Sequence, residues 1–328
     1  MARDKVVIGM ALPPGMTAAY AYFSAASALG YDREVDVEFD FFYGHEPAAT
    51  AQSLTAGDCT LACLNTIVGL IGRDRGLPMR AIGSKARRTH RWFAVVPASP
   101  IRTLADLRGK RIACDFTHLQ ALGEAALAAE GIAAGDIAWV PWRGSGTEAA
   151  RMVGPLQRGE VDAIFVIDWN LGDFEAEGLA LRLLPARLLD RIRASSCYWV
   201  TEDELKMRGE VMARAAQALG KSLAFGFADP EAAVQLMWER HRETRPAAPE
   251  RARIARRDLA ILKVVLEPMR VAPEDPDPRL GAIDAAALGD WHDYLVNAGT
   301  IRRLDVAQAF TTAYINDFNR FDAAAFGG

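Results

Sequence analysis

Apolar and polar positions alternate along the first 200 residues in a way that predicts strands separated by helices. Residues 35–42 alternate apolar and acidic side chains, which is the period-two pattern of a half-exposed strand. Short apolar runs predict further strands at 80–82, 92–96, 111–114, 138–140, 163–167 and 198–200. Ala- and Leu-rich stretches predict helices over 16–29, 65–73, 119–130 and 147–158. This alternation is typical of α/β domains with mostly parallel sheets and flanking helices.

The pattern changes after residue 200, where strand signals become rare. Helical periodicity predicts successive helices over 211–228, 230–244, 252–267 and 285–297. Pro and Asp cluster at 273–278, which indicates a loop between the last two of these helices. We therefore expect the α/β part to be followed by a helical C-terminal tail.

Two segments have the character of crossings between domains. A strand runs into a Pro-bracketed loop at 95–100, and a strand-like run enters the helical tail at 195–200. These crossings predict two lobes, one formed by residues 1–96 together with 197–328 and the other by the inserted residues 97–196. Two lobes joined by two strands form a hinge with a cleft between them, and such clefts are favoured sites for small molecules.

Charge and composition exclude several classes of function. The chain has 328 residues, with 38 Lys and Arg against 42 Asp and Glu, so its net charge of −4 gives no electrostatic basis for binding nucleic acid. Its longest apolar runs have the length of strands, so we expect no membrane insertion. The four cysteines lack the paired spacing of a zinc site and are expected to be small buried side chains: Cys59, Cys63, Cys114 and Cys197. We expect neither a metal nor a cofactor.

The first residues lead directly into a strand-like run at 6–8, with no charged-then-apolar signal region before it. Two cellular locations are therefore compatible with the sequence. We expect a periplasmic or cell-envelope protein if a leader has been removed, and a cytoplasmic protein otherwise.

Five segments resemble type II periplasmic binding proteins, and their order and spacing are similar as well: 53–58, 76–82, 99–113, 156–163 and 177–180. Together they resemble the branch that binds sulfonates, nitrate and the pyrimidine precursor of thiamine. The resemblance implies a two-lobed fold and the role of the substrate-binding component of an ABC importer, working with an ABC permease. These segments are helix ends, Gly turns and strand starts, so they support the fold more strongly than the ligand.

Candidate ligand-binding residues lie in the loops that follow the predicted strands. In open α/β sheets, ligands bind beyond the carboxyl ends of the strands, where helix N-termini offer unpaired N–H groups. This rule selects Pro14, Tyr43, His45, Asn65, Thr66, Phe116, Thr117, His118, Trp142, Asp168 and Trp169. Arg88 joins them from the basic run 87–91, which precedes the hinge strand and would attract an anionic solute.

Several of these residues have an alternative structural role. Asn65, Thr66 and Thr117 also fit helix N-caps, and Trp142 and Trp169 also fit packing at a domain edge. Asp168 is the stronger candidate, because an acidic side chain at the end of a strand must be solvated or paired. Tyr20 and Tyr22 lie on opposite faces of a predicted helix, so we expect at most one to face the cleft.

The leading hypothesis is capture of a small organic solute by hinge closure, without catalytic residues. Aromatic residues near the predicted cleft suggest a planar or heterocyclic part, and the arginines and helix N-termini would suit an anionic group. The alternative is a cytosolic enzyme on the same fold. Residues 84–90 and 106–111 resemble dihydroxyphthalate decarboxylases, for which Arg88, His90 or His118 would supply a cationic clamp and an acid.

Two other enzymes of similar architecture are disfavoured. The thiamine-pyrimidine synthases use Lys and His where this chain has Leu64 and Val68, and the sulfinate desulfinases use a Cys that is missing from 9–17.

Overall fold

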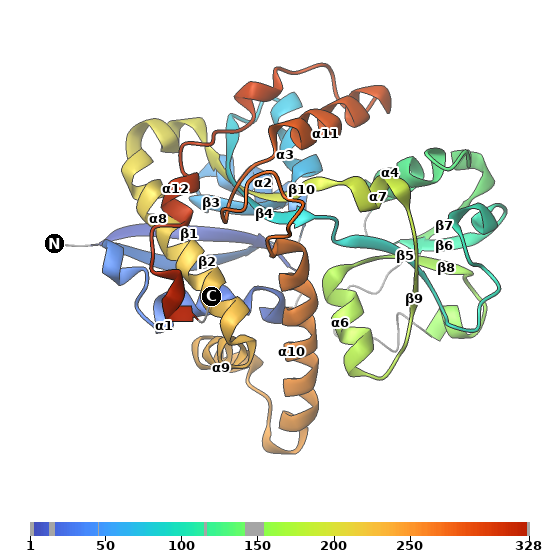
Figure 1. Ribbon diagram of the computed structural model, residues 1–328, viewed down its shortest axis with the longest axis horizontal. Coiled ribbons are helices and arrows are strands. Elements are labelled where there is room, and N and C mark those ends of the chain that lie inside the picture. The colour runs from blue at the N-terminus through green and yellow to red at the C-terminus, as the bar shows by residue number, and fades with distance from the viewer. Residues whose placement is uncertain (1–2, 13–16, 45, 115–116, 142–153, 327–328) are drawn as a thin grey trace.

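Two β-sheets with flanking helices lie side by side in the computed structural model, which describes residues 3–12, 17–44, 46–114, 117–141 and 154–326 (Figure 1). The first sheet has the strand order β2-β1-β3-β10-β4. Its strands are β1 (Asp4–Ala11), β2 (Val37–Gly44), β3 (Leu61–Asn65), β4 (Met79–Arg88) and β10 (Arg193–Thr201). β1 is parallel to β2 and β3, whereas β10 is antiparallel to β3 and β4.

The second sheet has the strand order β7-β6-β8-β5-β9. Its strands are β5 (Arg91–Val95), β6 (Arg111–Cys114), β7 (Ala138–Pro141), β8 (Ala163–Ile167) and β9 (Arg182–Leu184). β6 is parallel to β7 and β8, whereas β5 is antiparallel to β8 and β9. Both sheets are therefore mixed, and the reversed strand in each, β10 or β5, is one that the chain enters directly from the other lobe.

The chain changes sheet at two short connections. Only Thr89 and His90 separate β4 from β5, and only Ile192 separates helix α7 (Arg187–Arg191) from β10. Arg91–Val95 thus pairs in the second sheet, although the sequence suggested a crossing a few residues later, at 95–100. The lobes 1–96 with 197–328 and 97–196 stay a prediction, because pairing within a sheet does not by itself define a folding unit.

Helices cover both sheets, and their positions agree well with the apolar periodicity. The remaining helices are α1 (Ala21–Ala28), α2 (Pro47–Ala56), α3 (Thr66–Asp74), α4 (Thr117–Ala128), α6 (Asp168–Ala176), α8 (Glu202–Ala228), α9 (Pro230–Arg240), α10 (Arg251–Leu266), α11 (Ala285–Asn297) and α12 (Ile315–Phe318). Short 3-10 turns connect several of them. The helix expected over 147–158 falls largely outside the described residues. All four cysteines are buried, as expected.

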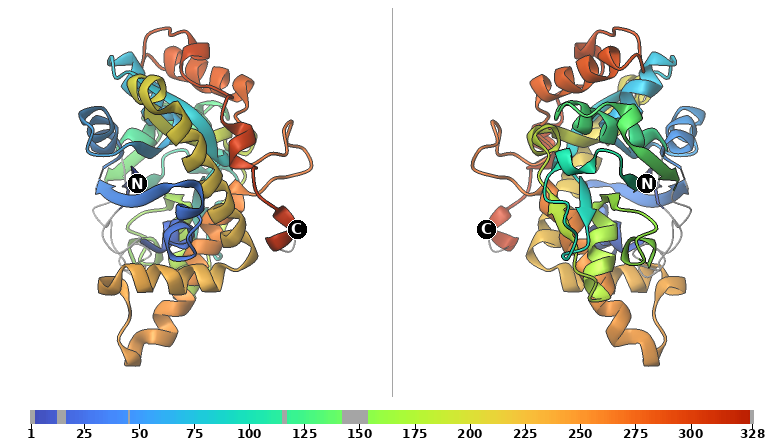
Figure 2. Two further views of the ribbon diagram at one scale, coloured as in Figure 1. Left: turned by 90° about the vertical axis from the view of Figure 1, so that its left-hand side faces the viewer. Right: turned by 90° about the vertical axis from the view of Figure 1, so that its right-hand side faces the viewer.

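Two contacts between helices link the lobes beyond the strands themselves. On one side, α10 packs along α6, with ion pairs from Arg253 to Glu177 (2.8 Å) and from Arg257 to Asp173 (4.0 Å). On the other side, the Tyr294 hydroxyl of α11 donates a hydrogen bond to the backbone oxygen of Ala121 in α4 (2.5 Å). Figures 1 and 2 show α10 standing beside α6 and α11 lying away from α10 across the sheets.

The close approach of α6 to α10 depends on a glycine. A Cβ on Gly172 of α6 would lie 2.5 Å from Cα and 2.6 Å from the backbone nitrogen of Ile261 in α10. Backbone atoms of a helix cannot rotate away as a side chain does, so any larger residue must separate the two helices.

We expect Gly172→Ala to lower the free energy of unfolding by roughly 1–3 kcal/mol, because the extra methyl group overpacks the α6–α10 contact. The matched control is Gly289→Ala in α11, where a Cβ would meet no atom within 4 Å. This control should be neutral or stabilising by up to about 1 kcal/mol, since Ala favours a helix over Gly. Urea unfolding of both variants measures the difference, and equal stability of the two would contradict the predicted clash.

Candidate functional site

A pocket lies between the two lobes, where the ends of β1 and β3 meet β4, the start of β5 and the start of α6. Its lining residues are Ala11, Tyr20, Pro47, Cys63, Leu64, Asn65, Lys85, Ala86, His90, Arg91, Ile167, Asp168, Trp169, Ser196 and Val265. Three charged side chains among them are almost completely buried: Lys85 is 6%, Arg91 2% and Asp168 4% exposed. Charged groups are rarely buried without compensating partners, so this clustering marks the pocket as a candidate site.

Lys85 enters the pocket from the middle of β4, a strand that is buried along most of its length. Its Nζ lies 4.6 Å from the centroid of the Tyr20 ring, a cation–π contact that partly offsets the lost hydration. Burial lowers the pKa of Lys85, whereas Cys63 and the Asp168 carboxylate act to raise it. A bound anion would act in the same direction as Asp168 and favour the charged ammonium.

Asp168 is the first residue of α6 and directly follows β8. Its Oδ1 accepts a hydrogen bond from the backbone N–H of Trp169 (2.8 Å), and its own N–H donates to the backbone oxygen of His90 (3.1 Å). Burial raises the pKa of Asp168 to about 6, although Lys85 and Arg91 act to lower it. The carboxylate is therefore ionised at neutral pH but becomes protonated in mild acid.

His90 connects three parts of the site through its two ring nitrogens. Nε2 lies 3.0 Å from Oδ1 of Asn65, and Nδ1 lies 2.7 Å from Oγ of Ser195. Burial, together with Arg91 and Lys85, holds the pKa of His90 well below its usual value, so the ring is neutral. Because a carboxamide oxygen can only accept, Nε2 carries the proton and donates to Asn65, while Nδ1 accepts from the Ser195 hydroxyl.

Three of the predicted site residues line this pocket: Asn65, Asp168 and Trp169. Asn65 occupies the N-cap position of α3, but its side chain makes no capping hydrogen bond, since its Oδ1 accepts from His90. Tyr20 lines the pocket while Tyr22 is fully buried in the core, in agreement with the expectation that at most one of them faces the cleft.

Three other predicted residues lie elsewhere. The Thr66 hydroxyl is buried and donates to the backbone oxygen of Ala194. The Tyr43 hydroxyl bonds Nε2 of His241 (2.9 Å), and the Arg88 guanidinium donates to the backbone oxygen of Glu267 (3.0 Å). None of the three lines the pocket, so contact with a ligand there stays a prediction for each.

The remaining predicted residues cannot be compared with the pocket. Pro14, His45, Phe116 and Trp142 lie outside the described residues, and the side chains of Thr117 and His118 are not described either. Their contacts with a ligand stay predictions.

The residues selected from the sequence did not include Lys85, and Arg91 was not singled out from the basic run. The available signal for Lys85 was a lysine among the small and apolar residues 81–86 of β4, where burial forces the charge into a pocket or a pair. The residues of the basic run 87–91 have different contacts in the structure. Arg87 is buried in an ion pair with Asp275 (2.9 Å) that anchors the C-terminal loop, and only His90 and Arg91 line the pocket.

Among the described residues, no cluster of three or more His, Cys, Asp or Glu side chains has a geometry that suits a metal ion. The described groups that line the pocket include the side chains of Lys85 and Arg91, the Asp168 carboxylate, a neutral imidazole and a carboxamide. Such a set can bind a ligand through charge and hydrogen bonds.

Comparison with known proteins gives one family and a group of solved structures. The family model described as "NMT1/THI5 like" matches residues 17–233. No curated protein matches at a significant level.

Similar solved structures include two sulfonate-binding proteins. The alkanesulfonate-binding protein SsuA of Xanthomonas axonopodis pv. citri, bound to MOPS, is 16% identical with a TM-score of 0.67, over 95% of this chain and 99% of that one. The periplasmic aliphatic sulphonate-binding protein SsuA of Escherichia coli is 16% identical with a TM-score of 0.69, over 97% and 99%. The desulfurization enzyme DSZB is 17% identical with a TM-score of 0.64, over 97% and 99%. These likenesses show the two-lobed fold.

The raised pKa of Asp168 predicts a pH-dependent stability. The folded protein binds this proton more tightly than the unfolded chain, so the ionised carboxylate destabilises the fold above about pH 6, and the penalty disappears toward pH 4. We expect Asp168→Asn to stabilise the protein at pH 7.5 by on the order of 2 kcal/mol. The gain should vanish near pH 4, as measured by urea unfolding at both pH values.

The control for this experiment is Asp106→Asn. Backbone N–H groups of Arg102 and Thr103 lower the pKa of Asp106, so its substitution should destabilise the protein at pH 7.5. His90 also affects stability at low pH, but it is present in all three proteins and cancels in the comparison. A loss of stability for Asp168→Asn at pH 7.5 would contradict the assigned cost of burying the carboxylate.

Proposed function

The chain belongs to the NMT1/THI5-like family, and we propose that it is the solute-binding component of an ABC importer that captures a small organic anion between its lobes. The fold supports this role, since similar structures include sulfonate-binding proteins of such importers. The observation that carries the proposal is the burial of Lys85 and Arg91 beside the Asp168 carboxylate in the interlobe pocket.

The charges in this pocket favour a monoanion. Lys85 and Arg91 bring two basic side chains to this pocket, beside Asp168 and a neutral His90. Burial of charges is costly unless they are paired, and within the described part of the chain the Lys85 ammonium contacts the Tyr20 ring but forms no ion pair. An anion bound between the lobes would supply that ion pair to Lys85.

The apolar lining favours an organic body on this anion. Tyr20 and Trp169 contribute aromatic surface from opposite lobes, and Val265 of α10 adds an aliphatic side chain. Aromatic faces provide large, rigid contact area for a planar or heterocyclic group. We infer a compact ligand with one anionic group and a flat or apolar part.

The way the pocket is built supports the proposed hinge closure. Asn65 and Lys85 come from the first sheet, whereas Asp168 and Trp169 come from the second, so a ligand that contacts both sets stabilises one relative orientation of the lobes. An ABC permease would then recognise that orientation. In this role the protein works in the periplasm or cell envelope. No described helix is long and apolar enough to cross a membrane.

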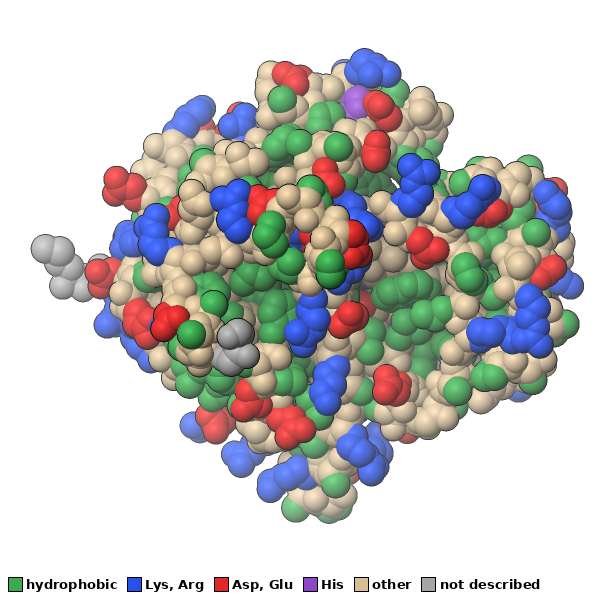
Figure 3. Space-filling model, viewed as in Figure 1, with side chains coloured by type: hydrophobic (Ala, Val, Ile, Leu, Met, Phe, Trp, Pro, Cys, Tyr) green, Lys and Arg blue, Asp and Glu red, His purple; other side chains and the backbone are tan. Residues whose placement is uncertain are grey.

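The face seen in Figure 3 carries acidic and basic side chains interspersed, without a basic stripe. Such a surface agrees with a small-molecule ligand and offers no electrostatic basis for binding nucleic acid.

The alternative function is a lyase of the aromatic-acid decarboxylase type, and the similarity to DSZB keeps an enzyme on this fold in view. Two of the residues expected to serve it are poorly suited. His90 is neutral with both nitrogens engaged, and Arg88 is bonded to the backbone at Glu267, away from the pocket. These observations favour binding over proton donation.

Titration with a panel of small carboxylates and sulfonates, together with their neutral amides, tests the proposed function. We expect calorimetry to detect binding of anions and much weaker binding of the amides. Lys85→Met should weaken the best anion by roughly 100-fold, because it removes a buried charge partner while keeping the length of the side chain. The control Lys263→Met changes an exposed lysine of α10 and should leave the affinity within about twofold.

Recovery of the ligand distinguishes transport from catalysis. The bound solute should be released unchanged after the protein is denatured. Release of carbon dioxide from an aromatic acid, or equal affinity for anions and amides, would overturn the proposal.

A further inference from the structure

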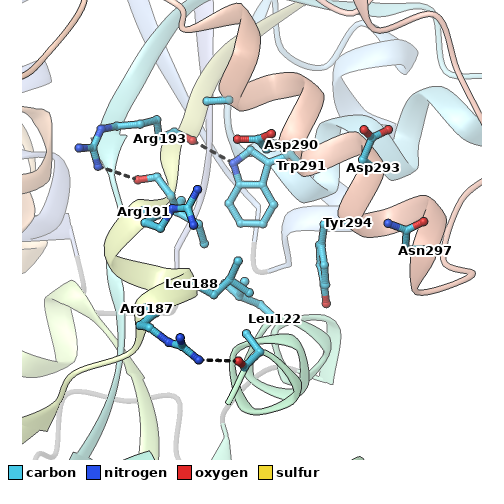
Figure 4. Close-up of a pocket in the computed structure, with 13 residues that line it drawn as sticks. Leu122, Arg187, Leu188, Arg191, Arg193, Asp290, Trp291, Asp293, Tyr294 and Asn297 are labelled. Carbon is cyan, nitrogen blue, oxygen red and sulfur yellow. Dashed lines mark hydrogen bonds between the residues drawn. The ribbon is translucent and has the colours of Figure 1, made fainter. Parts of the chain in front are cut away.

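A second cavity of about 570 Å³ lies on the α11 side of the hinge and has no lining residue in common with the interlobe pocket. Its walls come from α4, from the segment that carries α7 into β10, and from α11 (Figure 4). The lining residues are Leu122, Ala129, Arg187, Leu188, Arg191, Ile192, Arg193, Ala287, Asp290, Trp291, Asp293, Tyr294 and Asn297. This volume falls within the range of about 300–1,000 Å³ that is usual for small-molecule sites.

The two aromatic rings of this cavity are held in place by hydrogen bonds at their edges. Trp291 Nε1 donates to the backbone oxygen of Arg193 (3.0 Å), and the Tyr294 hydroxyl donates to the backbone oxygen of Ala121 (2.5 Å). The ring centroids are 6.4 Å apart with an angle of 70° between the planes. Fixed rings cost little entropy when a ligand packs on them, so this surface is preorganised for an apolar group.

The aliphatic part of the cavity lies beside these rings. Leu122 of α4 and Leu188 of α7 project toward Trp291 and Tyr294 from the facing wall (Figure 4). An aromatic or branched aliphatic body placed there would contact side chains from both lobes. The cavity therefore exists in this form only at the lobe orientation seen in the structure.

Charged groups of both signs remain available at the rim. Arg187 forms an ion pair with Glu130 (2.8 Å). The Asp293 carboxylate lies 3.0 Å from Nδ1 of His292 and 3.7 Å from the Arg303 guanidinium. The Arg193 guanidinium bonds backbone oxygens of Asp190 and Ile192. Arg191 and Asp290 are exposed, and within the described part of the chain neither forms an ion pair. One cation and one carboxylate thus face solvent beside the apolar surface.

We propose that this cavity is a second binding site, for a small zwitterion with an aromatic or branched apolar body, such as an apolar amino acid. Its carboxylate pairs with Arg191 and its ammonium group with Asp290, while its side chain packs on Trp291, Tyr294, Leu122 and Leu188. A simple anion would satisfy Arg191 but would face the Asp290 carboxylate, and a simple cation would have the opposite conflict.

Calorimetric titration with L-phenylalanine and two analogues tests this site. L-Phenylalaninamide lacks the carboxylate, and 3-phenylpropionate lacks the ammonium group. The three titrations use the Lys85→Met variant, because 3-phenylpropionate is an organic anion that the interlobe pocket of the wild-type protein is proposed to bind. We expect L-phenylalanine to bind this variant more tightly than either analogue by roughly fivefold, the range of an exposed ion pair. Arg191→Gln should remove the preference over the amide, and Asp290→Asn should remove the preference over phenylpropionate. Both residues are exposed, so neither change should affect folding.

Two further variants locate the binding. Leu188→Trp fills the cavity and should abolish binding of L-phenylalanine, with circular dichroism confirming the fold. Lys85→Met alters the interlobe pocket and should leave this binding within about twofold, which separates failure of this site from failure of the proposed function. Absence of binding by the wild-type protein, binding that survives Leu188→Trp, or loss of binding in Lys85→Met would each overturn the proposal.

Discussion

The hydrogen bonds of the His90 imidazole hold together the parts of the chain that connect the two sheets. The ring lies at the connection between β4 and β5, accepts from Ser195 of the returning strand β10, and donates to Asn65 at the end of β3. Both passages between the lobes therefore meet at one neutral side chain. This requires His90 to stay unprotonated, which its burial beside two cations ensures. The position of the pocket and the orientation of Asn65 depend on this arrangement.

Burying the charged side chains around that imidazole costs free energy of folding, and their contacts within the protein offset this cost only in part. Lys85 is compensated by an aromatic ring and by a carboxylate at a distance, and the pKa of Asp168 rises to about 6 despite two neighbouring cations. Elsewhere the protein pairs its buried charges closely, as at Arg87 and Asp275. At Asp168 the cost of burial therefore outweighs the attraction of the neighbouring cations, and local costs of this kind are common at functional sites.

The contacts that flank the hinge explain how one lobe orientation is maintained. Gly172 lets α6 approach the backbone of α10 on one side, and Tyr294 bridges from α11 to α4 on the other. Both contacts join residues more than 80 positions apart in the sequence. The interlobe pocket lies between the sheets and the second cavity lies beside the returning segment, and they share no lining residue.

The local pattern of apolar and polar residues was sufficient to predict most of the strands and helices. The strands at 111–114 and 163–167 and the helix at 285–297 were predicted with the bounds that the structure has, because both strands are short buried apolar runs and the helix has a helical apolar face. The rule that ligands lie beyond strand ends selected Asn65, Asp168 and Trp169, which line the interlobe pocket, and their contact with a ligand stays a prediction. It did not find Lys85, which lies within a strand, and it selected Thr66 and Tyr43, whose hydroxyl groups bond other parts of the protein.

The sequence by itself thus determined the α/β class, the two-lobed organisation and the resemblance to binding proteins, since these depend on periodicity and on short turn motifs. Tertiary structure decided which charged side chains meet. Arg87, Arg88 and Arg91 are close neighbours in the sequence, yet one anchors a C-terminal loop, one caps a distant backbone oxygen and one lines the pocket. Their roles depend on partners contributed by segments up to about 190 residues away, and no local pattern encodes those contacts.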